Sequence, residues 1–229
     1  MTNENSVELI GHYGGDITHA QSAWTSTYRE LTPEKIARIP KLLHGLANNN
    51  PPHKSPFEKS TLHFLVTTDI ASHIHIIKHR IGVSVNGESA RYKELKEDKY
   101  YLPSDWEDIK TTESPMVSEA GMLTSFEKWI DILKVYTEMG NGLYHECLAD
   151  LEPFLGRKRA KESARFFKTY NSQITSDVMF NWSSFAHFLK LRNKPEAQLE
   201  IREIASKMLD LVKNIDGNPF EYTIKAFNL

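Results

Sequence analysis

Lys78 to Tyr92 reads KHRIGVSVNGESARY, a short stretch in which basic residues and glycines are concentrated. Residues 78–93 contain four lysines and arginines against the single acid Glu88, a local charge of +3 in a chain whose net charge is −2. Gly82 and Gly87 allow the backbone to turn tightly or to approach a ligand closely. The composition therefore predicts a loop that binds an anion.

Two side chains at the end of this stretch are suited to a phosphate. Ser89 and Arg91 are two residues apart, so on an extended segment they point to the same side. The planar fork of an arginine matches phosphate oxygens, and a hydroxyl adds a neutral donor. The simpler interpretation is a solvated basic loop, which the composition by itself also allows.

The composition of the whole chain is that of a globular protein. Its 229 residues, 40% hydrophobic and 25% charged, suffice for one domain over residues 1–229 with a core that needs no disulfides. The near-neutral charge argues against a nucleic-acid partner. Cys147 is the only cysteine, which favours a reducing compartment. Without a leader-like N-terminus or a membrane-length apolar run, we expect a cytoplasmic protein with no membrane partner.

The first part of the chain predicts two strands and three helices. A strand over 7–11 precedes a helix that Asp16 caps and that runs to about residue 28. The helix starting at Thr32-Pro33-Glu34 should kink at Pro40. A second strand over 61–67 leads into a helix capped by Thr68 or Asp69. That helix should turn Ile70, Ile74 and Ile77 to the core, run to about Arg80, and deliver Lys78, His79 and Arg80 to a pocket as it ends.

The second part is predominantly helical. Apolar periodicity over 119–151 predicts a long helix or two, interrupted at 140–142, with Cys147 on the apolar face. The basic run 157–165 should open a helix whose Arg165 faces inward. A strand over 172–180 and helices over 181–192, 195–215 and 219–227 complete the chain. Strands and helices occur in mixed order, so we predict an α+β fold.

Three segments resemble one known family, the flavin-dependent thymidylate synthases or ThyX proteins. Lys78-His79-Arg80 followed by Ser89 is similar to the family signature, which reads Arg-His-Arg, seven residues, Ser. The segment 53–58, HKSPFE, resembles a second signature with a His, a small hydroxyl residue, Pro-Phe and Glu before a strand. The segment 188–192, FLKLR, matches the end of an Asn-led helix in the family. The three matches come in the family's order and spacing and span nearly the whole chain.

The resemblance implies both a fold and a reaction. The family fold has a central, mostly antiparallel sheet packed against several long helices. Its members form homotetramers whose active sites are shared between subunits. The reaction is the reductive methylation of dUMP to dTMP, with FAD as cofactor and with NADPH and 5,10-methylenetetrahydrofolate as co-substrates. We therefore expect dUMP as the nucleotide substrate and no metal.

The same resemblance assigns roles to individual residues. Arg192 would be catalytic, stabilising negative charge on the uracil ring as C5 becomes nucleophilic. The residues expected to bind dUMP are His75, Lys78, Glu88, Ser89, Ala90, Arg91, Arg165 and Arg192. The residues expected to bind FAD are His53, Ser55, Glu58, Lys78, His79, Arg80, Glu88, Asn181 and His187.

The chain departs from the family pattern at four places. Lys78 replaces an arginine, one extra residue separates Arg80 from Ser89, His75 stands where glutamine is common, and His187 where asparagine is expected. These departures leave open a variant enzyme that acts on dCMP or hydroxymethylates dUMP, and a non-catalytic relative that only binds flavin or nucleotide. A metal-dependent hydrolase using His73, His75 and His79 is a third alternative, although the third ligand is not evident from spacing.

Overall fold

The structure is a computed structural model that describes residues 4–89, 94–95, 97–111 and 127–229. The chain divides into two compact units. The helical unit comprises Met1–Asn5, Thr68–His73 and Glu88–Ile174, and the sheet unit comprises Ser6–Thr67, Ile74–Gly87 and Thr175–Leu229. Each unit is described by itself, and a single domain over 1–229 stays a prediction.

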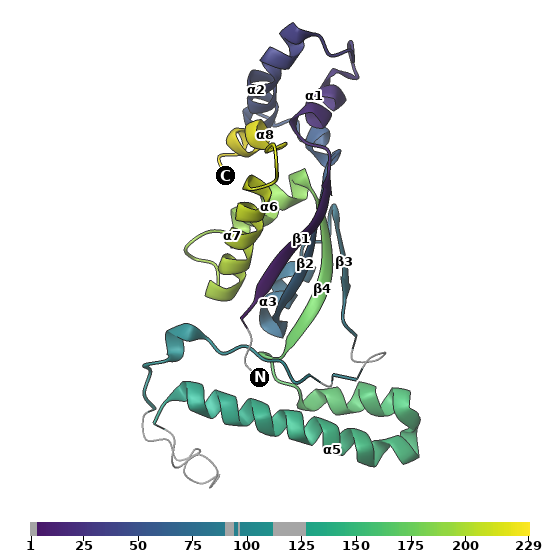
Figure 1. Cartoon of the computed structure of the whole chain (residues 1–229), viewed down its shortest axis with the longest axis vertical. Coiled ribbons are helices and arrows are strands. Elements are labelled where there is room, and N and C mark those ends of the chain that lie inside the picture. Colours follow the sequence, from purple (N-terminus) through teal and green to yellow (C-terminus); the bar gives the residue numbers. More distant parts are fainter. Residues whose placement is uncertain (1–3, 90–93, 96, 112–126) are drawn as a thin grey trace. The chain divides into compact units, whose positions relative to one another are not determined.

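The sheet unit is built on four antiparallel strands in the order β1-β2-β4-β3 (Figure 1). The strands are β1 (Ser6–Tyr13), β2 (Thr61–Asp69), β3 (Val83–Gly87) and β4 (Gln173–Asn181). β1 pairs with β2, with Val7 opposite Val66, and β3 pairs with β4, with Val85 opposite Val178. The predicted strands at 7–11, 61–67 and 172–180 are confirmed. β3 lies inside the basic stretch, where no strand was predicted.

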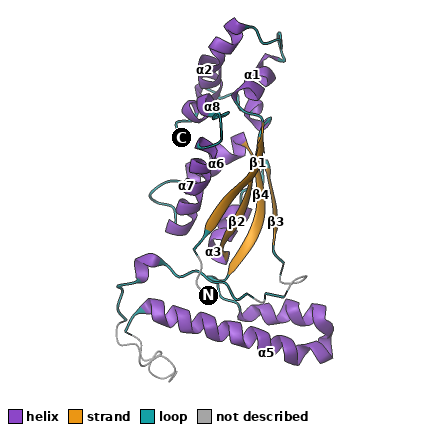
Figure 2. Ribbon diagram, viewed as in Figure 1, coloured by secondary structure: helices purple, strands orange, loops and turns teal. Residues whose placement is uncertain are grey.

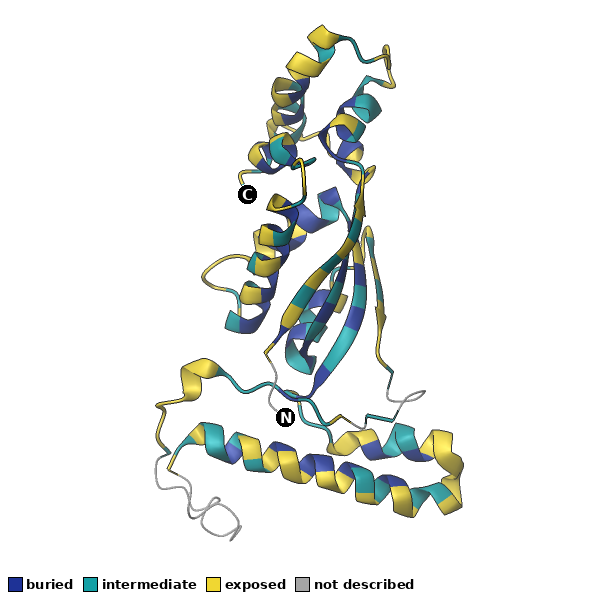
Figure 3. Ribbon diagram, in the orientation of Figure 1, coloured by how far each residue is buried: buried dark blue, intermediate teal, exposed yellow. Residues whose placement is uncertain are grey.

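One face of this sheet forms the core with the helices α6 (Trp182–Arg192) and α7 (Leu199–Lys213). Alternate residues of β2 are buried, which is the pattern of a strand with one face toward a core. Phe64 on β2 stacks on Phe185 of α6, with ring centroids 5.7 Å apart. Figures 2 and 3 show these helices beside the strands, with buried residues where they meet. Both helices were predicted, although α7 begins at Leu199 rather than 195.

Three further helices belong to the sheet unit: α1 (Asp16–Trp24), α2 (Pro33–Asn48) and α8 (Glu221–Ala226). The Thr32 side chain caps α2 as predicted, and the helix continues through Pro40. The predicted cap of α1 is wrong, since Gly15 occupies that position without a side-chain bond. Instead, the carboxylate of Asp16 accepts hydrogen bonds from the backbone N–H groups of Tyr222 and Thr223, both at 2.8 Å. It therefore caps the first turn of α8, a partner distant in sequence.

A buried chain of polar contacts extends from this cap. The hydroxyl of Thr223 donates to Asp16 at 2.5 Å, so it accepts from Nδ1 of His19 at 2.9 Å. Nε2 of His19 is then an acceptor for the hydroxyl of Ser60, at 2.7 Å. His19 is fully buried, and burial lowers its pKa to about 3. The histidine is therefore neutral in the folded protein.

α3 (Ile70–Ile77) begins and ends close to its predicted bounds. Oδ1 of Asp69 accepts from the backbone N–H of Ser72 at 2.7 Å, so Asp69 is the predicted cap. The helix ends three residues before Arg80. Ile76 is fully buried while Ile77 is 43% exposed, so the predicted inward position of Ile77 is wrong.

The helical unit contains α5 (Trp129–Ala164), which turns at Gly156, where φ is +74°. The predicted interruption at 140–142 is wrong because the helix is continuous there. Gly140 is needed for packing, since a Cβ at this position would lie 2.6 Å from the carbonyl oxygen of Phe167. After the kink at Gly156, the basic run 157–165 opens a second helical segment as predicted, but Arg165 is exposed, not inward. Residues 119–126 of the predicted helix lie outside the described residues.

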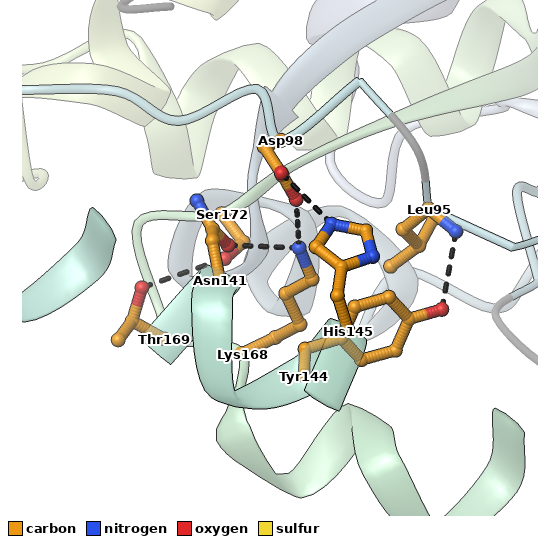
Figure 4. A network of polar contacts seen from close by, with 8 residues as sticks. All are labelled: Leu95, Asp98, Asn141, Tyr144, His145, Lys168, Thr169 and Ser172. Carbon is orange, nitrogen blue, oxygen red and sulfur yellow. Dashed lines mark hydrogen bonds and ion pairs between the residues drawn. The ribbon is translucent and has the colours of Figure 1, made fainter. Parts of the chain in front are cut away.

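A polar network crosses the helical unit (Figure 4). The ammonium of Lys168, whose side chain is 4% exposed, donates to Asp98 at 2.5 Å and to Asn141 at 2.8 Å. The other carboxylate oxygen of Asp98 lies 2.9 Å from Nε2 of His145. Because the buried ammonium has charged and neutral acceptors, its desolvation is compensated. Cys147 packs beside the apolar cluster around Tyr144, as predicted.

No helix within the described ranges has both the length and the apolar character needed to cross a membrane.

We expect His19 to make stability depend on pH. The unfolded state takes up a proton near the ordinary histidine pKa of 6.5, whereas the folded state does so only near 3. The free energy of unfolding should therefore fall as pH decreases through this window, by up to about 1.4 kcal/mol per pH unit. The measurement is urea denaturation from pH 7 to pH 4 of the wild type and of His19→Gln, which cannot titrate. The same pH dependence in both proteins would contradict this role.

Candidate functional site

The site is built where α3 ends and the chain turns toward β3. The helix stops at Ile77, and the backbone N–H of His79 bonds to the carbonyl of Ile76 at 3.0 Å. Lys78, His79 and Arg80 therefore follow the helix end one after another. This is the delivery of three basic residues that the sequence predicts.

The turn is held against the N-terminus of α6. Gly82 has φ +64°, a conformation that side chains disfavour, and its carbonyl accepts from the backbone N–H of Asn181 at 2.9 Å. The hydroxyl of Ser184 donates to the carbonyl of Ile81 at 2.5 Å. Oδ1 of Asn181 caps α6 by accepting from the N–H of Ser184 at 2.8 Å. We call these contacts of Ile81 and Gly82 with Asn181 and Ser184 the α6 clasp.

A cavity of about 470 Å³ opens beside the clasp. This volume is in the range of small-molecule sites. Its walls come from three separate segments: the loop before η1 (Ser55–Glu58), the turn after α3, and α6. The lining residues are Lys54, Lys78, His79, Arg80, Ile81, Val83, Ser183, Ser184, His187, Leu191 and Arg192.

The charge of the cavity is strongly one-sided. Lys54, Lys78, Arg80 and Arg192 are cations at neutral pH, and the described residues that line the cavity include no aspartate or glutamate. Like charges that converge in this way repel one another unless a counter-charge enters. The cavity is therefore suited to an anionic ligand such as a phosphate or pyrophosphate.

Two histidines complete the wall, and at least one of them is neutral. Burial, followed by the nearby Arg192 guanidinium, His187 and His75, lowers the pKa of His79 to about 4. Nε of Arg192 donates to Nε2 of His79 at 3.3 Å. His79 can accept this bond because it is unprotonated at neutral pH.

The structure brings together five of the residues predicted for the site: Lys78, His79, Arg80, His187 and Arg192 all line the cavity. Asn181 supports them through the clasp. His75 does not line the cavity, and its Nε2 lies 3.2 Å from Oε1 of Gln198. Of these seven residues, five therefore line the cavity, Asn181 supports it, and His75 lies outside the lining.

The segment 53–58 reaches the cavity through Lys54. His53, Ser55 and Glu58 are exposed and do not line the cavity, and Oγ of Ser55 lies 3.1 Å from Nε2 of His53. Lys54, between two predicted residues, does line it. No local sequence pattern identifies a loop lysine as a ligand. The position of Lys54 inside the 53–58 motif could nevertheless have indicated that it lies near the site.

The remaining predicted residues lie elsewhere. Glu88, Ser89 and Arg165 belong to the helical unit, where Glu88 lines a small cavity of about 30 Å³ with Asp98 and Lys168. Ala90 and Arg91 lie outside the described residues. No group of three histidines, cysteines or acids in the described ranges could hold a metal ion.

Comparisons with known proteins agree with these observations. The profile of the family described as "Thymidylate synthase complementing protein" (Thy1) matches residues 8–216. A protein named flavin-dependent thymidylate synthase from Rickettsia bellii is 33% identical over 218 residues, which cover 90% of this chain and 71% of that protein. One of the same name from Streptomyces avermitilis is 26% identical over 212 residues, covering 89% and 84%.

A solved structure shares the fold. It is the UMP/dUMP methylase PolB from Streptomyces cacaoi, bound with 5-Br dUMP. Its TM-score is 0.77 at 23% identity, over 99% of this chain and 96% of that one. At this identity the likeness concerns the fold alone.

We predict that Gly82→Ala disrupts the site. A Cβ at Gly82 would lie 2.2 Å from Nδ2 of Asn181 and 2.5 Å from Oγ of Ser184, and φ is positive. The change should lower the free energy of unfolding by about 1–3 kcal/mol and weaken anion binding, measured by urea denaturation and by pyrophosphate titration. Gly45→Ala is the control, since its Cβ would meet nothing within 4 Å inside α2. If Gly82→Ala and Gly45→Ala had the same free energy of unfolding, a Cβ at Gly82 would not strain the α6 clasp.

Proposed function

Because the chain belongs to the thymidylate synthase complementing protein (Thy1) family, whose curated relatives are flavin-dependent thymidylate synthases, we propose that it methylates dUMP at C5 to give dTMP. The observation that carries the proposal is the cavity beside the α6 clasp. Lys54, Lys78, Arg80 and Arg192 converge there without an acid in the described lining. A flavin pyrophosphate and a nucleotide phosphate are the anions that such a set of donors fits.

The turn at Gly82 shapes the wall of the cavity proposed for the flavin. The positive φ of Gly82 and the absence of a Cβ let the turn lie directly against Asn181 and Ser184. We infer that FAD is held by Lys78, His79, Arg80, Asn181 and His187. Lys78 supplies charge but not the bidentate fork of an arginine. The other proposed FAD ligands are His53, Ser55, Glu58 and Glu88.

When bound, the flavin supplies the redox chemistry of the reaction. The one-carbon unit of 5,10-methylenetetrahydrofolate is two electrons more oxidised than a methyl group, and NADPH provides these electrons as a hydride. C5 of dUMP gains the methyl group and releases its proton. Tetrahydrofolate and NADP⁺ are the other products, with the two folate nitrogens taking up protons.

The chain's own contribution is binding and charge stabilisation. Arg192 lines the cavity, and a guanidinium placed beside the uracil stabilises negative charge as C5 becomes nucleophilic. Ser89 and Arg91, with Arg165, are proposed to hold the dUMP phosphate. His75, Lys78, Glu88 and Ala90 complete the proposed dUMP site.

We further propose a homotetramer with active sites shared between subunits. Trp129, Tyr136 and Leu143 recur every seven residues along α5, which places them on one helix face, and they are 37%, 55% and 38% exposed. Met139, 36% exposed, extends the group. This exposed apolar stripe supports an interface between subunits at α5.

The measurement for the assembly is mass by light scattering at micromolar concentration. We expect about four times the 26.3 kDa of one chain. A Tyr136→Lys, Leu143→Lys double variant should give a smaller particle, because two charges would be buried without partners. A wild-type mass of one chain would exclude the tetramer.

The test of the reaction combines absorption with product analysis. We expect the purified protein to carry a flavin spectrum and, with NADPH, 5,10-methylenetetrahydrofolate and dUMP, to yield a product heavier by one methyl group. Arg192→Ala should lower turnover about 100-fold or more with flavin retained, because one electrostatic donor of the transition state is lost. Lys194→Ala, two residues away on the surface, is the matched control and should keep full activity.

Other outcomes have distinct meanings. A hydroxymethylated product, or a product from dCMP alone, would replace the proposal by a variant enzyme. Bound flavin without turnover would indicate a relative that only binds. Full activity of Arg192→Ala would remove its catalytic role while leaving the reaction in place.

A further inference from the structure

Arg192 reaches the cavity from the last turn of α6 with one of its donors already used. Its Nε bonds to Nε2 of His79 at 3.3 Å. Within the described part of the chain, no hydrogen bond or ion pair occupies its two Nη groups. An arginine has five N–H donors in a rigid plane, so a bond at Nε fixes the direction in which the other four point.

His79 is well placed to hold this bond. Its ring contacts the rings of Phe188 at 5.2 Å and His187 at 5.9 Å, both edge-on, so packing restricts its rotation. Since Nε2 accepts from an always-charged guanidinium, the imidazole carries its proton on Nδ1. The pKa of about 4, lowered by burial and by Arg192, keeps it in this neutral form at neutral pH.

We propose that His79 is a positioning residue for Arg192: it occupies Nε and thereby presents the paired Nη groups to the ligand. The ligand would be a planar ring with adjacent oxygen and nitrogen acceptors, such as a pyrimidine that is losing its N3 proton. This inference rests on the proposed function for its substrate, but the Arg192–His79 bond exists independently of it. It adds to the FAD contact proposed for His79, since the bond to Arg192 occupies only Nε2 of the ring.

A pair of variants separates the bond from packing. His79→Gln keeps an acceptor oxygen, whereas His79→Leu removes it with a side chain of similar size. For His79→Leu, assayed with saturating FAD, we expect kcat for dUMP to fall about 10-fold to 100-fold, because a misplaced catalytic group costs up to about 100-fold. For His79→Gln we expect kcat within about threefold of the wild type. Equal kcat in the wild type and His79→Leu, or an equal loss in both variants, would overturn the proposal.

A double-mutant cycle tests whether the effect passes through Arg192. The dUMP affinity of the flavin-loaded protein is measured for the wild type, His79→Leu, Arg192→Lys and the double variant. Lysine lacks the Nε–H, so we expect the double variant to bind dUMP as Arg192→Lys does. If the two substitutions instead lowered the dUMP affinity by factors that multiply in the double variant, His79 would act independently of Arg192.

A readout without activity distinguishes this inference from the proposed reaction. In ¹⁵N NMR spectra of the protein, the Arg192 Nε–H should exchange slowly with water in the wild type and in His79→Gln, and fast in His79→Leu. If no variant or wild-type sample methylates dUMP but this pattern holds, the proposed reaction fails and the positioning bond stands. Fast exchange in the wild type would overturn the bond itself.

Discussion

The hydrogen bonds between the turn after α3 and the N-terminus of α6 are the constraint on which the cavity depends. The carbonyls of Ile81 and Gly82 accept from Ser184 and Asn181, and Gly82 must adopt φ +64° for this to occur. The same asparagine caps α6 through the backbone of Ser184. Asn181 therefore starts the helix that carries Arg192 and holds the turn that carries Lys78 and Arg80.

The turn after α3 and α6 bring positive charges close together, which costs electrostatic free energy. Four cations line a cavity of about 470 Å³, and their mutual repulsion opposes folding until an anion binds. His79 does not add to this charge, because burial and Arg192 lower its pKa to about 4. A neutral imidazole beside a guanidinium is an acceptor rather than a fifth repelling group. The electrostatics and the hydrogen bonding of the wall are thus consistent with each other.

A second buried polar chain in the sheet unit extends from Ser60 through His19 and Thr223 to Asp16. Every distance in this chain lies between 2.5 and 2.9 Å, and each hydroxyl can donate and accept in one consistent order. It joins the start of α1 to α8 and to the residue before β2. Since an unsatisfied buried polar group is costly, these contacts favour one arrangement of the elements over alternatives.

Local rules in the sequence determined most of the elements. The apolar alternation around Phe64, the caps Thr32, Asp69 and Asn181, and the basic residues after α3 were all predictable, because capping and periodicity involve near neighbours. Tertiary structure alone decided that Asp16 caps α8, that Gly140 packs under a carbonyl within a continuous helix, and that Lys54 enters the cavity wall. In each case the residue makes its contact with a segment that is distant along the chain. Close packing against a backbone carbonyl, or a position in the wall of a cavity, produces no periodic pattern in the sequence.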